Sequence, residues 1–355
     1  MPAIRVVVVE DSLTVRKRLV QILSSDPDFA VVGEAGDGRT AITMCEMLRP
    51  DVMALDMVLP VMTGLDVTEH VMAHFPTPIL VVSASTNRGE LFQTYDALAA
   101  GALDVLDKPT GVEPDGVWER KFLSTMKLLS RIKVITHPRA RLRASAAPAH
   151  AGPRRSPPGS APRVVAIGAS TGGPAAVREL LNGLPVHFPL PILLVIHLAE
   201  GFGAVFADWL DSVSPLRVSA ARTGDRLPPV GQGKVFLAPP NAHLVLRGDR
   251  LELSTEPERN FCRPSVDVLF ESVAREVGPA AIACVLTGMG RDGAAGLLDV
   301  RRAGGRCIAQ DEATSIVYGM PREAALLGAA QQVLPLPDIA GAILQWARVG
   351  SEGEA

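Results

Sequence analysis

The chain has 355 residues and a mass of 37.5 kDa, which is enough for two or three domains of ordinary size. Hydrophobic residues make up 47% of it and charged residues 21%, a composition that excludes an intrinsically disordered protein. No apolar run is long enough to span a bilayer, and the first residues lack the features of a signal peptide, so we expect neither membrane insertion nor secretion. The four cysteines form no CxxC pair, which is typical of reduced, mostly buried thiols in a cytoplasmic protein.

The charge pattern divides the chain into three segments. Residues 1–135 and residues 163–355 each carry more acidic than basic side chains, which argues against nucleic-acid binding by either segment. Residues 136–162 contain five arginines and no acidic residue, and they are rich in Pro, Ala and Ser. Because such a sequence cannot bury enough apolar surface to fold, it predicts a flexible linker. Its arginines either keep the linker solvated or contact an acidic surface.

The first segment alternates between short apolar runs and helical stretches. The runs that predict strands are 4–9, 30–33, 52–56, 79–83 and 102–106. Helical stretches such as 12–23 and 39–48 lie between them. Five short strands with helical connections predict a doubly wound parallel sheet of the flavodoxin-like α/β type, with helices on both faces. In such sheets the chemistry gathers beyond the carboxyl ends of the strands.

Polar side chains gather at that edge of the predicted sheet. They follow or end four of the strands: Glu10, Asp11, Asp56, Ser83 and Lys108. Three carboxylates at one edge repel one another unless a cation lies among them, and oxygen ligands that keep part of a hydration shell suit Mg²⁺. The hydroxyl of Ser83 and the amine of Lys108 can both contact a phosphoryl group. The pattern therefore predicts a site for magnesium and a phosphoryl group in the first segment.

The motifs VVVVEDS, LDMVLPVMTG, VVSAST and DVLDKP resemble those of bacterial response-regulator receiver domains, over about residues 3–125. The resemblance implies that Asp56 is the phosphoacceptor and that Ser83 and Lys108 sense the phosphoryl group. It implies Mg²⁺ ligands that are carboxylates and one backbone carbonyl: Glu10, Asp11, Asp56 and Val58. The Lys108–Pro109 peptide bond is expected to be cis. Two residues depart from the usual receiver pattern: Glu10 stands where Asp is common, and Val105 stands where many receivers carry an aromatic switch residue.

The last segment places three polar residues after three further predicted strands. Ser170 follows the strand 163–168, and His197 directly follows the strand 191–196. Asp292 follows the strand 281–287, within a glycine-rich loop. If these strands are parallel neighbours, the three side chains converge as the nucleophile, base and orienting acid of hydrolytic acyl transfer. Backbone N–H groups of the two glycine-rich turns, at Thr171 and Met289, are candidates for an oxyanion hole.

Each of these residues also has a plainer interpretation. Ser170 could cap the helix that follows it. His197 could be a hydrogen-bonded core histidine, and Asp292 could cap a helix or pair with a neighbouring arginine. The coincidence of all three at strand ends favours catalysis.

Two other motifs offer competing functions. Gly168-x-Ser170-x-Gly172 matches the nucleophile elbow of α/β-hydrolases, which would make His243 the base and Asp208 or Asp225 the acid. His243, however, lies in a predicted β-hairpin, an improbable place for a triad base. The second glycine loop, 288–293, matches a dinucleotide-binding fingerprint with Asp311 downstream, but Asp292 inside it would repel a pyrophosphate.

The last segment also resembles the catalytic domain of the chemotaxis protein-glutamate methylesterase family, over about residues 163–346. The motifs that carry the resemblance are AIGASTGGP, PPNAHL, CRPSVDVLFES, VLTGMGRDGAAGL and AQDEATSIVYGMP. The resemblance implies that Ser170 attacks glutamyl methyl esters on chemoreceptor cytoplasmic domains, with His197 as base and Asp292 as orienting acid. It also implies release of methanol, deamidation of receptor glutamines, and a receiver that covers the active site until it is phosphorylated. Leu198 and Ala199 stand where the family usually has Met-Pro.

The sequence thus predicts two doubly wound α/β domains, the second a Rossmann-like three-layer unit with a β-hairpin. The expected boundaries are 1–125 for the receiver, 126–162 for a helix end and linker, and 163–349 for the esterase. We expect a cytoplasmic monomer that takes phosphate from a chemotaxis histidine kinase and needs Mg²⁺ for that step but no cofactor for ester hydrolysis. The remaining alternatives are a small-ester hydrolase and a non-catalytic binding module linked to a receiver.

Overall fold

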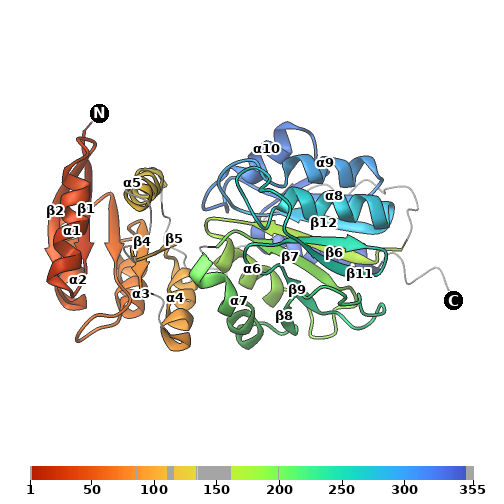
Figure 1. The fold of residues 1–355 in the computed structure, drawn as a ribbon, viewed down its shortest axis with the longest axis horizontal. Coiled ribbons are helices and arrows are strands. Elements are labelled where there is room, and N and C mark those ends of the chain that lie inside the picture. The colour runs from red at the N-terminus through yellow and green to blue at the C-terminus, as the bar shows by residue number, and fades with distance from the viewer. Residues whose placement is uncertain are drawn as a thin grey trace, which may run out of the picture.

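The computed structural model describes residues 2–84, 87–109, 116–132, 134, 161–198 and 200–348. Two parallel sheets lie side by side, each with helices on both faces (Figure 1). This is the doubly wound α/β architecture that the sequence predicts. Most of the predicted linker, 136–162, lies outside the described residues. None of the helices in the described ranges combines the length and the apolar character that crossing a membrane requires.

The first sheet has the strand order β2-β1-β3-β4-β5 and is parallel throughout. Its strands are β1 (Ile4–Val9), β2 (Phe29–Ala35), β3 (Val52–Leu55), β4 (Ile79–Ser83) and β5 (Asp104–Asp107). Its helices are α1 (Leu13–Ser24), α2 (Gly38–Leu48), α3 (Gly64–His74), α4 (Arg88–Ala100) and α5 (Val117–Leu129). Val6 and Val8 pack in the cluster of α1 and α5, whereas Val7 and Val9 pack in that of α2, α3 and α4. Strands buried on both faces explain why these runs are apolar without interruption.

The second sheet has the order β14-β13-β12-β6-β7-β9-β8 and is also parallel. Its strands are β6 (Val164–Ala169), β7 (Ile192–Ile196), β8 (Val218–Ala220), β9 (Val235–Leu237), β12 (Ala281–Val285), β13 (Arg306–Gln310) and β14 (Gln332–Leu334). The predicted hairpin is present as β10 (His243–Arg247) and β11 (Arg250–Ser254). The strand order reverses at β6, because β7 lies on one side of it and β12 on the other. This is where an open α/β sheet forms a crevice.

Helices cover the second sheet in two layers. The helices α6 (Gly173–Asn182), α7 (Glu200–Val213) and α11 (Leu336–Arg348) share one apolar cluster, which continues into the first sheet. The helices α8 (Val266–Val277), α9 (Ala294–Arg302) and α10 (Met320–Leu326) pack on the other face together with the hairpin. A short 3-10 helix, Gly278–Ala280, leads into β12.

The two halves of the molecule meet where α4 packs against α6 and α7 (Figure 1). Tyr95 of α4 packs its ring against Phe206 and Trp209 of α7, and its hydroxyl donates to the carbonyl of Phe202. Trp209 Nε1 donates to Asp96 Oδ1 at 2.9 Å. This contact is a buried aromatic cluster with satisfied polar groups, so it resembles a domain core more than a surface contact.

Candidate active site and phosphoacceptor site

Ser170 and His197 lie at the carboxyl ends of neighbouring strands. Ala169 of β6 is in register with Ile196 of β7, so the next residues, Ser170 and His197, are side by side beyond the sheet. The backbone holds them there, since Ser170 N donates to Thr287 O at 3.0 Å and His197 N donates to Ala169 O at 3.1 Å. Both side chains are half-buried. The spacing of parallel strands brings the two groups within a short reach of each other.

Glycines make this close approach possible. A Cβ atom at Gly288 would lie 2.7 Å from the Cβ of Ser170, so a side chain there would displace the serine. Gly172 has a φ of +76°, and its Cβ would lie 2.6 Å from Ile316. Gly172, and not Ser170, is the N-cap of α6, and it makes no side-chain cap hydrogen bond. The plainer interpretation of Ser170 as a helix cap is therefore wrong.

Asp292 is buried beneath His197 and fully hydrogen-bonded. Its Oδ2 lies 3.0 Å from His197 Nε2. The N-terminus of α8 supplies further donors to the carboxylate: Ser265 Oγ at 2.7 Å, Val266 N at 2.7 Å and Asp267 N at 3.2 Å. Asn260 Nδ2 adds a contact of 3.2 Å. A carboxylate at a helix N-terminus is stabilised by the N–H groups and the helix dipole.

These contacts shift the pKa values of both partners. Burial opposes ionisation of Asp292, but the hydrogen bond and charge of His197 and the donors of α8 hold its pKa below the usual range. Burial alone would lower the pKa of His197, yet the contacts with Asp292 and Cys262 raise it from 6.5 to about 9. The imidazole is therefore protonated at neutral pH, and it can accept a proton only after losing one.

The second ring nitrogen of His197 faces a cysteine. Because Nε2 is engaged by Asp292, Nδ1 is left to face the crevice, where it lies 3.8 Å from Cys262 Sγ. Ser170 Oγ forms no hydrogen bond to His197 within the described part of the chain. The strand order thus brings the predicted serine, histidine and aspartate together, but only the histidine–aspartate hydrogen bond is formed.

Two backbone N–H groups beside Ser170 have no acceptor among the described residues, those of Thr171 and Met289. Thr171 follows the serine directly, and Met289 lies in the glycine loop that packs behind it. The Thr171 side chain is engaged elsewhere, with Oγ1 3.3 Å from Asp104 Oδ2. Free N–H donors at this position can bind a negatively charged oxygen.

The polar residues of the first sheet form a separate cluster at its carboxyl edge. Lys108 Nζ lies 2.8 Å from Glu10 Oε2 and 2.9 Å from Asp56 Oδ2. Carboxylate oxygens of Glu10, Asp11 and Asp56 lie within 4.8 Å of one another. Burial raises the pKa of both Glu10 and Asp56, and Lys108 only partly offsets it. Ser83 Oγ is buried and has no hydrogen-bond partner among the described residues.

This cluster has the donor set of a magnesium site. Three carboxylates close together, one of them exposed, offer hard oxygen ligands with room for water.

The prediction of a cis peptide bond at Lys108–Pro109 is wrong, since the cis peptide bond found among the described residues is Arg263–Pro264. Val105, at the position of the usual aromatic switch, is a buried core residue.

The first half of the molecule lies directly against the turn that carries Ser170. Gly172 N donates to Leu103 O at 3.2 Å, and Thr171 Oγ1 contacts Asp104 at the start of β5. Ile316, which packs beneath Gly172, also contacts the apolar cluster of α1 and α5. The two candidate sites are therefore connected through β5, because Lys108 follows the end of that strand.

Comparison with known proteins gives the family of the chain. Residues 165–343 match the CheB methylesterase family, and residues 6–114 match the response regulator receiver domain. Protein-glutamate methylesterase/protein-glutamine glutaminase 4 of Myxococcus xanthus is 44% identical over 340 residues, which are 95% of this chain and 95% of that protein. This chain belongs to the CheB methylesterase family.

Two further members illustrate the match. Protein-glutamate methylesterase/protein-glutamine glutaminase 2 of Pseudomonas aeruginosa is 43% identical over 349 residues and covers 97% of both chains. The solved methylesterase catalytic domain of Thermotoga maritima CheB is 36% identical and covers 52% of this chain and 98% of that structure, with a TM-score of 0.49.

The structure of this CheB-family chain argues against the competing functions that the two glycine-rich motifs suggest. His243 is buried, with Nδ1 accepting from Ser265 N at 3.1 Å and Nε2 3.2 Å from the carbonyl of Pro257, so it supports the loop before α8. Asp208 is exposed and pairs with Arg88, and Asp225 caps the turn at Arg222. The hydrolase triad built on His243 is therefore wrong. Asp311 of the dinucleotide alternative accepts from Thr314 in a local turn.

Three residues at the site of this CheB-family chain were not predicted: Asn260, Cys262 and Ser265. All three precede or begin α8 and reach Asp292 or His197 from a loop far away in the sequence. No spacing rule connects them with Ser170. The only sequence signal was their inclusion in or beside the CRPSVDVLFES motif, which was used for the family resemblance and not for the site.

Proposed function

We propose that this protein hydrolyses glutamate methyl esters of chemoreceptor cytoplasmic domains and deamidates receptor glutamines, under control of receiver phosphorylation. One observation carries the chemistry: a serine, a histidine and a buried aspartate lie in the segments that follow the adjacent strands β6, β7 and β12. The names of the relatives from Myxococcus xanthus and Pseudomonas aeruginosa support glutamate methyl esters and glutamines of a protein as the substrates, and the chemoreceptor is part of the proposal. The proposed location is the cytoplasm, and the proposed working unit is a monomer.

In this proposal, Ser170 Oγ attacks the carbonyl carbon of the glutamyl ester and its proton passes to Nδ1 of neutral His197. The negative oxygen of the tetrahedral intermediate accepts hydrogen bonds from Thr171 N and Met289 N. Collapse breaks the bond to the methoxy group, which leaves as methanol with the proton from His197. Water, deprotonated by the same histidine, then attacks the acyl-enzyme and releases glutamate and free Ser170. With glutamine the leaving group is ammonia.

Asp292 has an orienting role in this scheme. Its bond to Nε2 fixes the imidazole so that Nδ1 faces the serine, and its negative charge stabilises the imidazolium that forms. The donors of α8 hold Asp292 itself, so the orientation of the base depends on the start of that helix. The proposal requires that the hydrogen bond between Ser170 and His197 forms when substrate binds.

The first domain is proposed to receive a phosphoryl group on Asp56 from a histidine kinase. Glu10, Asp11, Asp56 and the carbonyl of Val58 would hold Mg²⁺, which neutralises the charge of the phosphoryl group when bound. In this proposal Lys108 and Ser83 contact the added oxygens. The distance of 2.9 Å from Lys108 Nζ to Asp56 Oδ2 supports the first role, and the lack of a hydrogen-bond partner for Ser83 Oγ among the described residues supports the second. Because β5 joins Lys108 to the contact at Leu103 and Asp104, such a change reaches the turn of Ser170.

Methanol release from a methylated receptor fragment tests this function. We expect release by the full chain, stimulation by a small phosphodonor such as acetyl phosphate, and no release by Ser170→Ala. Asp56→Asn should keep the basal rate and lose the stimulation. Release by Ser170→Ala at the normal rate would contradict the acyl-enzyme scheme, and equal stimulation of Asp56→Asn would contradict the control by phosphorylation.

A further inference from the structure

A strained loop lies beside the candidate active site, between β11 and α8. Arg259 and Cys262 exchange both backbone hydrogen bonds, at 3.1 and 2.9 Å, which closes a two-residue turn. The two residues inside the turn, Asn260 and Phe261, have φ values of +54° and +62°. Such turns favour Gly, Asn or Asp, because positive φ is unfavourable for a bulky side chain. A phenylalanine in this position needs an explanation beyond the turn itself.

The ring of Phe261 is almost fully exposed in the part of the chain that the structure describes. It is 96% exposed, the largest exposed fraction among the large apolar side chains of the described residues. The residues on either side of it are fixed, however. Asn260 Nδ2 donates to Asp267 Oδ2 at 2.8 Å and contacts Asp292 Oδ1 at 3.2 Å, while Cys262 contacts His197. The loop therefore exposes the ring of Phe261, while the residues on either side of that ring are held by contacts with Asp292 and His197.

Two arginines line the same hollow as Phe261. The hollow is bounded by Pro257, Glu258, Asn260, Phe261, Arg263 and Arg291. Among the described residues, neither Arg263 nor Arg291 forms an ion pair, in contrast to Arg259, which pairs with Glu271 at 2.8 Å. Nη1 of Arg263 donates to the backbone carbonyls of Thr255 and Glu256 at 3.4 and 3.3 Å, whereas its Nε is buried and has no hydrogen-bond partner among the described residues. With Glu258 as its single carboxylate, the hollow combines an excess of positive charge with an unpartnered aromatic ring.

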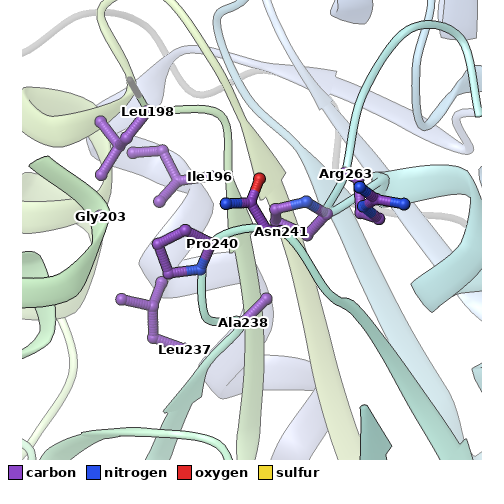
Figure 2. Close-up of a pocket in the computed structure, with 9 residues that line it drawn as sticks. Ile196, Leu198, Gly203, Leu237, Ala238, Pro240, Asn241 and Arg263 are labelled. Carbon is purple, nitrogen blue, oxygen red and sulfur yellow. The ribbon is translucent and has the colours of Figure 1, made fainter. Parts of the chain in front are cut away.

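Arg263 also borders a second, smaller cavity of about 100 Å³. Figure 2 shows Ile196, Leu198 and Pro240 on the side of this cavity opposite Arg263. Ile196 and Leu198 are the neighbours of His197 in the chain. A bound segment that crosses Arg263 can therefore contact both Phe261 and the cavity beside the base, whose lining is partly polar and partly apolar.

We propose that Phe261, Arg263 and Arg291 form a docking surface for the acidic stretch of the substrate protein that flanks the modified glutamyl residue. The inference rests on the proposed function and adds the recognition of residues around the ester. Each turnover leaves a glutamate carboxylate on the substrate, so a segment with several modified positions becomes acidic beside the remaining esters. Its carboxylates pair with the two arginines, and an apolar side chain packs on Phe261.

Steady-state kinetics on two substrates tests this surface. The first substrate is a methylated receptor fragment, and the second is p-nitrophenyl acetate, which has no flanking residues. We expect Phe261→Ala and Arg291→Gln each to raise KM for the fragment about tenfold while kcat stays within about twofold, because the lost contacts bind ground state and transition state alike. Turnover of p-nitrophenyl acetate should not change. Arg263→Gln should likewise raise KM for the fragment and leave kcat and the turnover of p-nitrophenyl acetate nearly unchanged.

Three controls separate docking from loop structure. Phe261→Gly relieves the positive φ but also removes the ring, so docking requires the same KM defect as in Phe261→Ala. Val186→Ala and Arg217→Gln alter exposed side chains outside both hollows and should leave KM unchanged. Added salt should raise KM of the wild-type chain more than that of Arg291→Gln.

The outcomes are distinguishable. An unchanged KM for the fragment in Phe261→Ala and Arg291→Gln would overturn the docking surface while leaving the proposed function intact. A parallel loss of p-nitrophenyl acetate turnover would show that the loop acts only through Asp292 and His197, which would also overturn it. If the wild-type chain released no methanol from the fragment, the proposed function itself would fail.

Discussion

The two candidate sites of this protein occupy the same place in two similar folds, yet the pKa values of their buried carboxylates are shifted in opposite directions. Asp292 accepts hydrogen bonds from an imidazole, a hydroxyl, two backbone N–H groups and an amide, and its pKa is lowered against the effect of burial. Asp56 and Glu10 share one lysine, and burial raises the pKa of both. The buried carboxylate of the candidate esterase site therefore has its hydrogen-bond donors in place, whereas the proposed roles of Asp56 and Glu10 require a cation and a phosphoryl group to complete their site.

The largest expected effect separates the two sites by activity. Ser170→Ala and His197→Ala should each lower esterase kcat by roughly 10⁴-fold, because the members of a triad act as a unit. Phosphorylation of Asp56 by acetyl phosphate should be unaffected in both variants and should stop when Mg²⁺ is chelated. Methanol release and phosphoprotein labelling measure the two functions. Most of the activity remaining in Ser170→Ala would contradict the assignment of the nucleophile.

The pH dependence of kcat/KM tests whether the contacts of His197 raise its pKa. Because Asp292 helps to raise the pKa of His197 to about 9, kcat/KM should increase roughly 50-fold between pH 7 and pH 9 as the imidazole loses its proton. Asp292→Asn should lower that pKa and flatten the profile over this range, besides lowering the maximal rate. The same shift affects stability: the contribution of protonated His197 is complete below about pH 6.5 and is lost as the pH rises through 9. A profile that rises around pH 6.5 in the wild-type chain would contradict the contacts of His197.

Cys262 offers a chemical test of the surroundings of His197 Nδ1. Cys45, Cys284 and Cys307 are buried, whereas Cys262 is half-buried and lies 3.8 Å from His197 Nδ1. Alkylation with iodoacetamide should therefore remove most of the esterase activity by placing a bulky group against the base. Cys262→Ala should be active and should resist the reagent. Equal inactivation of Cys262→Ala would show that another residue is the target.

The smallest expected effects compare one substitution at both sites. Asp56→Asn removes one of two buried carboxylates that share Lys108, so it should raise the free energy of unfolding by about 1 kcal/mol. Asp292→Asn leaves several donors without a full acceptor and should lower that free energy by roughly 1–3 kcal/mol. Urea unfolding of the two variants measures both values. If both substitutions changed the free energy of unfolding in the same direction, the opposite pKa shifts of Asp56 and Asp292 would be contradicted.

The sequence was sufficient to locate the residues that depend on sheet topology alone. Ser170, His197 and Asp292 each follow a strand, and parallel strands bring their carboxyl ends together, so strand recognition was enough. Cys262 and Asn260 could not be found in this way, because they reach the site through a loop whose path depends on the packing of α8 and the hairpin. The geometry of the Lys108–Pro109 bond depends on local packing in the same way.

The aromatic cluster of Tyr95, Phe206 and Trp209 has a consequence for temperature. Any separation of the two halves exposes these rings to water, and exposure of apolar surface increases the heat capacity. The free energy that holds the halves together is therefore a curved function of temperature, and its hydrophobic part weakens on cooling. If the proposed control by the receiver acts through this contact, the esterase is restrained less in the cold, and we expect its basal rate to fall less steeply on cooling than the chemistry alone would require.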